Sequence, residues 1–293
     1  MTNTTTKNPG TSSEALHYHY DISNNFYQLW LDPSLTYSCA LWEENEGYES
    51  HEIAQIRKLD FHINQARVKD AKRVLDIGCG WGSTLKRLAD VYKVERAVGI
   101  TLTKSHADAI TAFKNPNIEV LLESWAEHSP AEPYDGIISL EAFEHFAKLN
   151  ASEAEKLEGY RSFFSQCHSF LKPGGWISIQ TIIYGNSTKE DFSKFCAEKV
   201  FPDSDLPRLW EIVKASEGLF EIVALRTDRE HYVRTFKAWL KKLKENRQQA
   251  VDLVGEESVA RYEKYCGLFM IGFHTGTMDL SRIAMRRIDK PRF

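Results

Sequence analysis

Four residues in the first third of the chain have the types and spacing of a ligand-binding turn. Asp76, Gly78, Gly80 and Gly82 form the pattern D-x-G-x-G-x-G at the end of a short apolar run. Glycine lets the backbone approach a ligand closely, and a helix expected over 84–92 presents its N-terminus beyond the turn. The pattern differs from the G-x-G-x-x-G of dinucleotide-binding folds. It predicts a nucleotide-type ligand, and the alternative is a tight strand–helix turn without a ligand.

A second group of reactive side chains consists of Glu141, Glu144 and His145, which follow the apolar run 134–140. They stand at positions i, i+3 and i+4, which on a helix would place them on one face. Paired carboxylates beside a histidine could hold an ammonium group or take a proton from a carbon or an amine. The other interpretation is a solvated, charged helix face.

The composition argues against several classes of protein. A formal charge of −4 on 293 residues is unlike the basic surface of a nucleic-acid binder. Five cysteines without C-x-x-C spacing argue against a metal site and a disulfide framework, and favour the cytoplasm. No apolar run is long enough to span a membrane, and residues 1–15 are predicted to be a disordered leader. Peripheral contact with a membrane and a homo-oligomer are both compatible with this sequence.

The elements that must position these side chains alternate in type. Strands are predicted at 73–77, 96–100, 118–122, 134–140, 176–182, 220–227 and 281–287, the last as an edge strand. Helices are predicted from about residue 24 and over 49–66, 84–92, 104–113, 160–171, 234–249 and 257–274. This alternation predicts an α/β fold with a doubly wound, mainly parallel seven-stranded sheet. Residues 16–293 would form one domain, with an N-terminal helical segment (16–70) and a helical cap (185–215).

Further motifs extend along most of the chain. They are H-Y-D-I-S at 19–23, T-Y-S-C-A at 36–40, A-Q-I-x-K at 54–58, D-I-G-C-G-W-G at 76–82, G-I-T-L-T at 99–103, A-F-E-H-F at 142–146, F-P-x-x-x-L-P at 201–207 and H-Y-x-x-T at 231–235. In these motifs the chain resembles the family of cyclopropane fatty acid synthases and mycolic acid cyclopropane synthases, which are Rossmann-like class I methyltransferases dependent on S-adenosylmethionine (SAM). Plant benzylisoquinoline N-methyltransferases share much of this framework.

The resemblance implies a set of residues around the methyl donor. Tyr37 and Ser38 would contact the methionine part of SAM, Thr101 the ribose and Trp125 the adenine. The remaining implied cofactor-binding positions are Asp76, Gly78, Gly80, Gly82, Leu102, His106, Ser124 and Glu141. The family usually has Gln at the position of His106 and an acid at that of Ala126.

The resemblance also implies how a proton leaves the product. An alkene that takes up the methyl becomes a carbocation, which the aromatic residues near 18–42 and 192–210 could stabilise with their ring faces. In cyclopropane synthases the proton acceptor is a bound bicarbonate, and the matching positions here are Cys39, Glu144, Gln180 and Tyr232. Gln180 replaces a histidine and cannot carry a proton near neutral pH. Cyclopropane synthases have glycine at the position of Glu141, whereas the plant N-methyltransferases have glutamate there.

The leading hypothesis is therefore a SAM-dependent methyltransferase that acts on an olefinic carbon of a lipid or isoprenoid-like natural product, by C-methylation or cyclopropanation. S-adenosylhomocysteine would be the second product. The candidate catalytic residues are Glu141, Glu144, His145, Tyr232, Gln180 and Cys39. The alternatives are an N-methyltransferase for a small amine and a SAM- or lipid-binding protein without catalysis. A nicotinamide-dependent dehydrogenase would need an acid at the end of the second strand, where this chain has Thr101.

Overall fold

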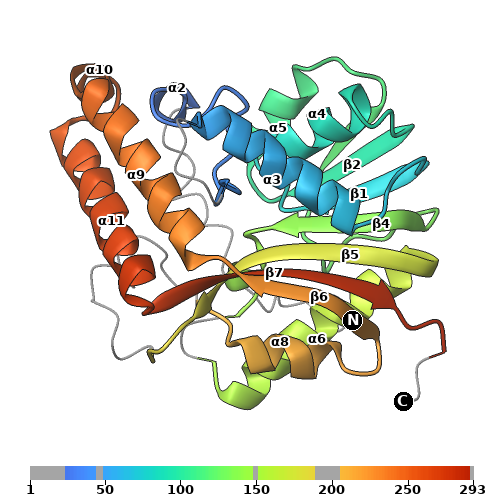
Figure 1. Cartoon of the computed structure of the whole chain (residues 1–293). Helices are drawn as coiled ribbons and strands as arrows, with labels where there is room; N and C mark the ends of the chain where they lie inside the picture. Colours follow the sequence, from blue (N-terminus) through green and yellow to red (C-terminus); the bar gives the residue numbers. More distant parts are fainter. Residues whose placement is uncertain (1–23, 44–48, 148–150, 189–204, 291–293) are drawn as a thin grey trace, which may run out of the picture.

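A computed structural model describes residues 24–43, 49–147, 151–188 and 205–290 (Figure 1). Within these residues, seven strands form one sheet in the order β3-β2-β1-β4-β5-β7-β6. The strands are β1 (Arg73–Ile77), β2 (Arg96–Thr101), β3 (Ile118–Leu122), β4 (Tyr134–Leu140), β5 (Leu171–Tyr184), β6 (Phe220–Thr227) and β7 (Met278–Arg287). The predicted leader 1–15 and most of the predicted cap, residues 189–204, lie outside the described residues.

The first five strands are parallel, and β7 runs antiparallel to both of its neighbours, β5 and β6. The predicted doubly wound, mainly parallel sheet is therefore confirmed. The prediction that 281–287 forms an edge strand is wrong, because β7 lies between β5 and β6 and leaves β6 at the edge. Strand β5 also begins five residues earlier than predicted, and its pairing with β4 jumps from Leu171 to Trp176 across a bulge.

Helices cover both faces of the sheet (Figure 1). On one face lie α3 (His51–Gln65), α4 (Ser83–Asp90) and α5 (Lys104–Thr111), and on the other lie α6 (Glu153–Phe170) and α8 (Leu209–Ser216). Leu85 and Leu88 of α4 are fully buried in the first core, and Phe163 and Phe164 of α6 in the second. Because burying one such side chain stabilises the fold by roughly 1.5–3 kcal/mol, these two cores fix the ends of the strands in space.

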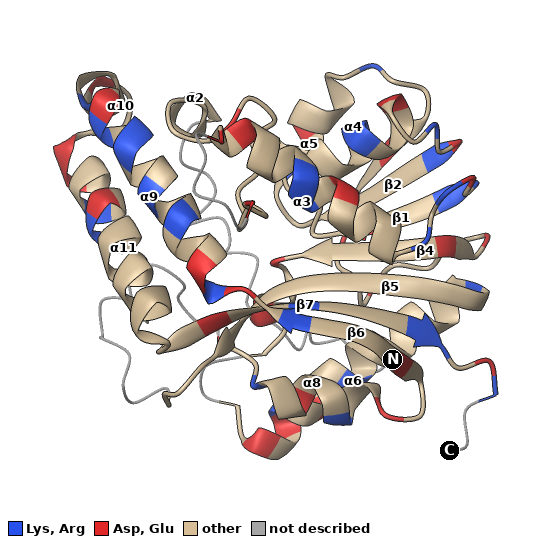
Figure 2. Ribbon diagram, in the orientation of Figure 1, with Lys and Arg blue, Asp and Glu red and all other residues tan. Residues whose placement is uncertain are grey.

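A third group of helices lies beyond the carboxyl ends of the strands (Figure 1). It contains α2 (Asn24–Gln28), α9 (Arg229–Glu245), α10 (Arg247–Val254) and α11 (Glu256–Thr275). The predicted helix 234–249 is thus two helices, α9 and α10. Charged residues occur along α9, α10 and α11, whereas most of the sheet carries few (Figure 2). Among the described residues, no helix is long and apolar enough to cross a membrane.

The aromatic residues of the N-terminal segment build the core of this helical layer. Phe26 and Trp30 are fully buried, and the ring of Trp30 lies 5.7 Å from that of Trp239 on α9. Phe26 packs edge-on against Tyr262 of α11 at 5.0 Å. These residues therefore serve packing. Trp210, at the described end of the predicted cap, is 45% exposed on α8, which packs against α6. That part of the predicted cap covers a sheet face instead of the carboxyl ends of the strands.

Candidate active site

The turn after β1 depends on three glycines in the left-handed region of backbone space. The φ angles are 76° at Gly78, 50° at Gly80 and 84° at Gly82, which side chains with a Cβ adopt at a cost. A Cβ at Gly78 would lie 2.5 Å from the Cβ of Ala142, and one at Gly82 would lie 2.7 Å from Cγ1 of Ile110. At Gly80 a Cβ would meet nothing within 4 Å. Gly78 and Gly82 therefore allow close packing, while Gly80 leaves open space above the backbone.

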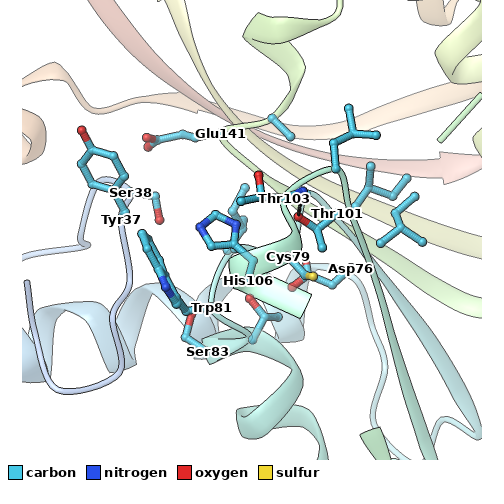
Figure 3. A pocket seen from close by; sticks show the side chains of 18 of the residues that line it. Tyr37, Ser38, Asp76, Cys79, Trp81, Ser83, Thr101, Thr103, His106 and Glu141 are labelled. Atoms are coloured by element: carbon cyan, nitrogen blue, oxygen red, sulfur yellow. Dashed lines mark hydrogen bonds between the residues drawn. The ribbon is translucent and has the colours of Figure 1, made fainter. Parts of the chain in front are cut away.

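A pocket lies over this turn, at the carboxyl ends of β1, β2 and β4 (Figure 3). The predicted cofactor-binding residues line it with one exception, and they are Tyr37, Ser38, Asp76, Gly78, Gly80, Thr101, Leu102, His106, Ser124, Trp125 and Glu141. The exception is Gly82, which lets α4 pack on Ile110 of α5 and does not line the pocket. The carboxyl ends of the parallel strands thus bring residues from distant parts of the sequence to one cavity.

Asp76 lies at the base of the pocket with 1% of its surface exposed. Burial raises the pKa of its carboxyl to about 7, and a hydrogen bond with Thr84 opposes that rise. Its Oδ2 atom has no hydrogen-bond partner among the described residues. A buried acceptor of this kind is costly unless a ligand donates to it. Together with the open space above Gly80, it fits a ligand that carries hydroxyl or ammonium donors, as SAM does.

Aromatic side chains form the middle of the pocket. The rings of Trp81 and His106 lie 4.2 Å apart, and both residues are buried (Figure 3). Burial lowers the pKa of His106 to about 4, so this ring is neutral at physiological pH. Trp125 packs against Phe146 and Phe163 with ring centroids 5.4 and 5.5 Å away. These surfaces are suited to the flat, uncharged parts of a nucleoside.

Glu141 projects its carboxylate at the other end of the pocket, toward Tyr37 (Figure 3). Its Oε1 atom accepts hydrogen bonds from the Cys39 backbone N–H (2.8 Å) and from Nε2 of Gln180 (2.7 Å), and Oε2 accepts one from the Tyr232 hydroxyl (2.5 Å). Its φ of 55° lies in the left-handed region, which costs of order 1–3 kcal/mol for a residue with a side chain. Three donors hold the carboxylate in spite of this strained backbone.

Gln180 is fully buried behind Glu141 and uses its whole amide. Its Nε2 atom donates to Glu141 and to the carbonyl of Cys39 (3.1 Å). Its Oε1 atom accepts from Nε of Arg282 (2.8 Å) and from Nε2 of His62 (3.1 Å). A histidine has only two ring nitrogens and could not make these four bonds. The glutamine is therefore matched to its neighbours.

The neighbours of Gln180 complete a buried polar network. Since Oε1 of Gln180 only accepts, Nε2 of His62 carries the hydrogen, and Nδ1 accepts from the Ser178 hydroxyl at 2.8 Å. Burial and the nearby Arg282 hold the pKa of His62 well below its usual range, which keeps this ring neutral. Arg282 is 2% exposed and pairs with Asp228. His62 and Arg282, which are held by Ser178 and Asp228, therefore fix the side chain of Gln180 behind Glu141.

Glu144 and His145 do not share a helix face with Glu141, so that prediction is wrong. The chain forms only a single 3-10 turn, η1 (Phe143–His145), and Glu141 precedes it in the left-handed region. The carboxylate of Glu144 accepts a hydrogen bond from the Thr181 hydroxyl at 2.9 Å. Burial, followed by the charge of Glu141, raises the pKa of Glu144 to about 8. His145 lines the pocket, and burial lowers its pKa to about 4.

The candidate catalytic residues thus fall into two groups. Glu141 and His145 line the pocket, whereas Glu144, Gln180, Tyr232 and Cys39 are buried and are not among the lining residues. Burial raises the pKa of the Cys39 thiol, so it is not a thiolate, and its backbone N–H makes the contact with Glu141. In the second group, Cys39, Gln180 and Tyr232 contact the Glu141 carboxylate by hydrogen bonds, whereas Glu144 bonds to Thr181.

The described residues do not fit a bound bicarbonate. The backbone N–H of Cys39 and the hydroxyl of Tyr232, which the resemblance assigns to bicarbonate, both donate to Glu141. Gln180 has no remaining donor, because Glu141 and the Cys39 carbonyl take both amide hydrogens. Glu144 accepts from Thr181. The groups expected around a free anion already surround a carboxylate that belongs to the chain.

Two charged lining residues, Lys58 and Glu123, were not predicted from the sequence. Lys58 of α3 is fully buried, its Nζ donates to the Ser38 hydroxyl at 2.8 Å, and burial lowers its pKa to about 8. Glu123 directly follows β3 and pairs with His128 at 2.5 Å. Its place at the carboxyl end of a parallel strand was a signal for it. The signal for Lys58 was the spacing of four polar residues three or four positions apart along α3, which places them on one helix face. The structure buries all four: His51, Gln55, Lys58 and His62.

The fold and the pocket define a class I SAM-dependent methyltransferase. Comparison with known proteins identifies the family. The model of the mycolic acid cyclopropane synthetase family matches residues 7–283, and the chain belongs to this family.

Individual relatives agree with this assignment. Hydroxymycolate synthase MmaA4 of Mycobacterium tuberculosis is 33% identical over 273 residues, which cover 87% of this chain and 86% of that protein. The structure of mycolic acid cyclopropane synthase CmaA1 complexed with SAH and CTAB matches with a TM-score of 0.84 at 30% identity, over 95% of this chain and 99% of the other. Coclaurine N-methyltransferase bound to N-methylheliamine and SAH matches with a TM-score of 0.80 at 24% identity, over 96% and 84% of the two chains, and shows the shared fold.

Proposed function

We propose that this enzyme transfers the methyl group of SAM to an olefinic carbon of a lipid or isoprenoid-like natural product. The observation that carries the proposal is the layout of one pocket. A glycine turn with the unsatisfied carboxylate oxygen of Asp76 lies at one end, and the Glu141 carboxylate lies at the other. The similarity to synthases named for mycolic acids favours a lipid chain over other olefins.

The donor half of the pocket would hold SAM by backbone and aromatic contacts. Gly80 lets the main chain approach the ligand, Gly78 lets the turn pack against Ala142, and Asp76 would accept a hydrogen bond from the ligand. Tyr37 and Ser38 would contact the methionine part, with Lys58 fixing the Ser38 hydroxyl. The ribose would lie near Thr101 and Leu102, and the adenine against Trp125, with Ser124 and His106 beside it. When bound there, SAM supplies an electrophilic methyl group on a sulfonium centre.

The acceptor half would then manage a positive charge. Methylation of an alkene leaves a carbocation on the neighbouring carbon, and this cation must lose a proton to give a methyl branch or a cyclopropane ring. The ring of Tyr37 and the carboxylate of Glu141 face this part of the pocket (Figure 3). An aromatic face and an anion both stabilise a nearby cation. His145, which also lines the pocket, is neutral and would contribute shape and a hydrogen bond.

A second candidate function is N-methylation of a small amine. The specific observation in its favour is again Glu141, because a carboxylate beside an aromatic ring also suits an ammonium group. The donor half of the pocket would be used in the same way. The two functions differ only in the acceptor, so the acceptor is what has to be tested.

The test is a methyl-transfer assay with SAM labelled in the methyl group. The acceptors are vesicles of a phospholipid with cis-monounsaturated acyl chains, farnesyl diphosphate, and a tetrahydroisoquinoline amine. We expect label in the lipid, located by mass spectrometry on the former double bond. Label in the amine alone would overturn the proposal and support N-methylation. SAM binding in a calorimeter without S-adenosylhomocysteine from any acceptor would indicate a binding protein.

The setting of the reaction is part of the same proposal. A lipid acceptor would bring the enzyme into peripheral contact with a membrane. The free, buried thiols of Cys39, Cys79, Cys167 and Cys266 are in keeping with a reducing cytoplasm. Residues 16–293 would act as one domain, as a monomer or a homo-oligomer.

A further inference from the structure

The proposed function leaves open which group removes the proton, and the surroundings of Glu141 bear on that question. Its carboxylate receives the Cys39 backbone N–H and one Gln180 amide hydrogen on Oε1, and the Tyr232 hydroxyl on Oε2. Three donors converging on two oxygens form an anion-binding site. In this chain the anion is covalently part of the protein.

We infer that the Glu141 carboxylate is the built-in proton acceptor of the reaction. It stands where the resemblance to cyclopropane synthases implies a bound bicarbonate, and turnover therefore needs no added anion. The inference rests on the proposed olefin methylation. It extends that proposal by naming the base and by excluding a bound anion, such as bicarbonate, from the reaction.

The backbone gives independent support. Glu141 adopts a φ of 55°, a conformation natural to glycine and strained for glutamate. Strain of this kind persists when the surroundings hold the residue in place, and it is concentrated at functional sites. Here the surroundings are the three donors, and the strained backbone is what directs the carboxylate back onto them. A glutamate in a relaxed conformation would point elsewhere.

The site can keep the carboxylate ionised until it is needed. Burial raises the pKa of Glu141 above its usual value, and hydrogen bonds from Tyr232, Cys39 and Gln180 and the charge of Lys58 oppose that rise. Glu144 interacts electrostatically with Glu141, has its pKa raised to about 8 and is mostly protonated near pH 7. The pair therefore carries one negative charge, and the donors favour Glu141 as its holder.

The proton transfer balances without another reagent. The alkene π electrons form the new carbon–carbon bond as the methyl–sulfur bond breaks, which leaves a carbocation and neutral S-adenosylhomocysteine. A C–H bond next to the cationic carbon, or on the new methyl group, then breaks. Its electron pair forms a double bond or closes the cyclopropane ring, and the proton goes to a Glu141 oxygen. Release of that proton to solvent restores the carboxylate.

The experiment compares the full-length enzyme with Glu141→Gly, assayed with cis-monounsaturated phospholipid vesicles at saturating SAM. In buffer freed of carbon dioxide, the unmodified enzyme should keep its full rate. Glu141→Gly should lose at least 100-fold in rate and regain a tenfold or larger part of it when bicarbonate or formate is added. Glycine removes the side chain and leaves the three donors free to bind the added anion.

A matched variant separates filling of the site from loss of the base. Glu141→Gln keeps the size and the strained backbone but is a far weaker base, so it should be inactive and should not respond to either anion. A wild-type rate that falls in carbon dioxide-free buffer and returns with bicarbonate would overturn the inference, as would an active Glu141→Gln. Calorimetric SAM binding by each variant confirms that it is folded. Failure of the unmodified enzyme to methylate any olefin would instead refute the proposed function.

Discussion

The two ends of the pocket are built in different ways. At the donor end, Asp76, Gly78 and Gly80 are neighbours in the sequence, and Thr101 and Glu123 each lie at the end of a strand. At the acceptor end, Glu141 depends on partners 102, 39 and 91 residues away. The glycine turn of the donor end is therefore formed by local backbone conformation, and the ends of parallel strands bring other lining residues to it. The acceptor site is a long-range assembly of side chains that must each find a partner in a buried place.

This difference predicts different responses to substitution. Backbone contacts at the donor end act on SAM whatever the acceptor is, so damage there should appear as lost affinity. Hydrogen bonds to a buried charge are each worth about 1.5–3 kcal/mol, and those at the acceptor end are made to Glu141. Damage there should appear in turnover, with SAM affinity retained.

The largest effect is expected at Gly78. Gly78→Ala adds a Cβ that would lie 2.5 Å from the Cβ of Ala142, on a backbone with a φ of 76°. Relieving this clash has to move the turn that carries the SAM site. We expect SAM binding to weaken about 100-fold, or roughly 3 kcal/mol, as measured by isothermal titration calorimetry.

Gly174 provides the matched control. It has a similar φ of 73°, lies in the bulge of β5, and an added Cβ would meet nothing within 4 Å. Gly174→Ala should cost about 1–2 kcal/mol of stability from the backbone alone and leave SAM affinity unchanged. Equal losses of affinity in the two variants would mean that the donor end does not depend on local packing at Gly78.

A smaller and more selective effect is expected at Tyr232. Tyr232→Phe removes the hydroxyl that donates to Oε2 of Glu141 at 2.5 Å and keeps the ring. If the carboxylate is aligned by that hydrogen bond, kcat should fall about 10- to 100-fold. The Kd for SAM should stay within about twofold, because the hydroxyl lies outside the donor end.

Tyr262→Phe tests whether this loss is specific. Tyr262 belongs to the same helical layer, and its hydroxyl pairs with that of Tyr27 at 2.8 Å. Removing this neutral bond should lower the free energy of unfolding by about 1 kcal/mol and leave kcat unchanged. An equal fall in kcat in both variants would show that the layer acts by general rigidity and not through Glu141.

The same contrast explains what the sequence could reveal. The donor end was predictable because a glycine pattern and the ends of parallel strands are local signals. Gly82, which was expected at the ligand, is not among the lining residues and instead faces Ile110 of α5, a contact that the glycine pattern does not reveal. Glu141, Glu144 and His145 have helical spacing, but the positive φ of Glu141 depends on partners elsewhere in the chain.

The buried polar network behind the pocket could not be predicted from the sequence for a related reason. Arg282 meets Gln180 and Asp228 only because β7, the last strand in the sequence, pairs in the interior of the sheet. The order of strands in a sheet is decided by the packing of whole layers, so the residues of a single strand do not indicate which strands it pairs with. Predicting 281–287 as an edge strand hid this network, even though the strand itself was found.

The smallest expected effect concerns Glu144 and shows in stability. Its pKa is about 8 in the folded protein against an ordinary value of 4.5, so folding favours its protonated form. This contribution to stability is fully present below about pH 4.5 and is lost as the pH rises through about 8. Asp76, with a pKa of about 7, contributes with the same sign. Urea unfolding of the wild type should therefore give a free energy that decreases between about pH 7 and pH 8. In this range the buried histidines His62, His106 and His145, whose lowered pKa values act with the opposite sign at lower pH, are mostly neutral in the folded and the unfolded state. Glu144→Gln, which mimics the neutral acid, should reduce that decrease by roughly 1 kcal/mol or more.

Glu158→Gln, on the exposed face of α6, should keep the wild-type profile. An unchanged pH profile in Glu144→Gln would mean that Glu144 is ionised beside Glu141, and the single shared charge at the acceptor end would then be wrong.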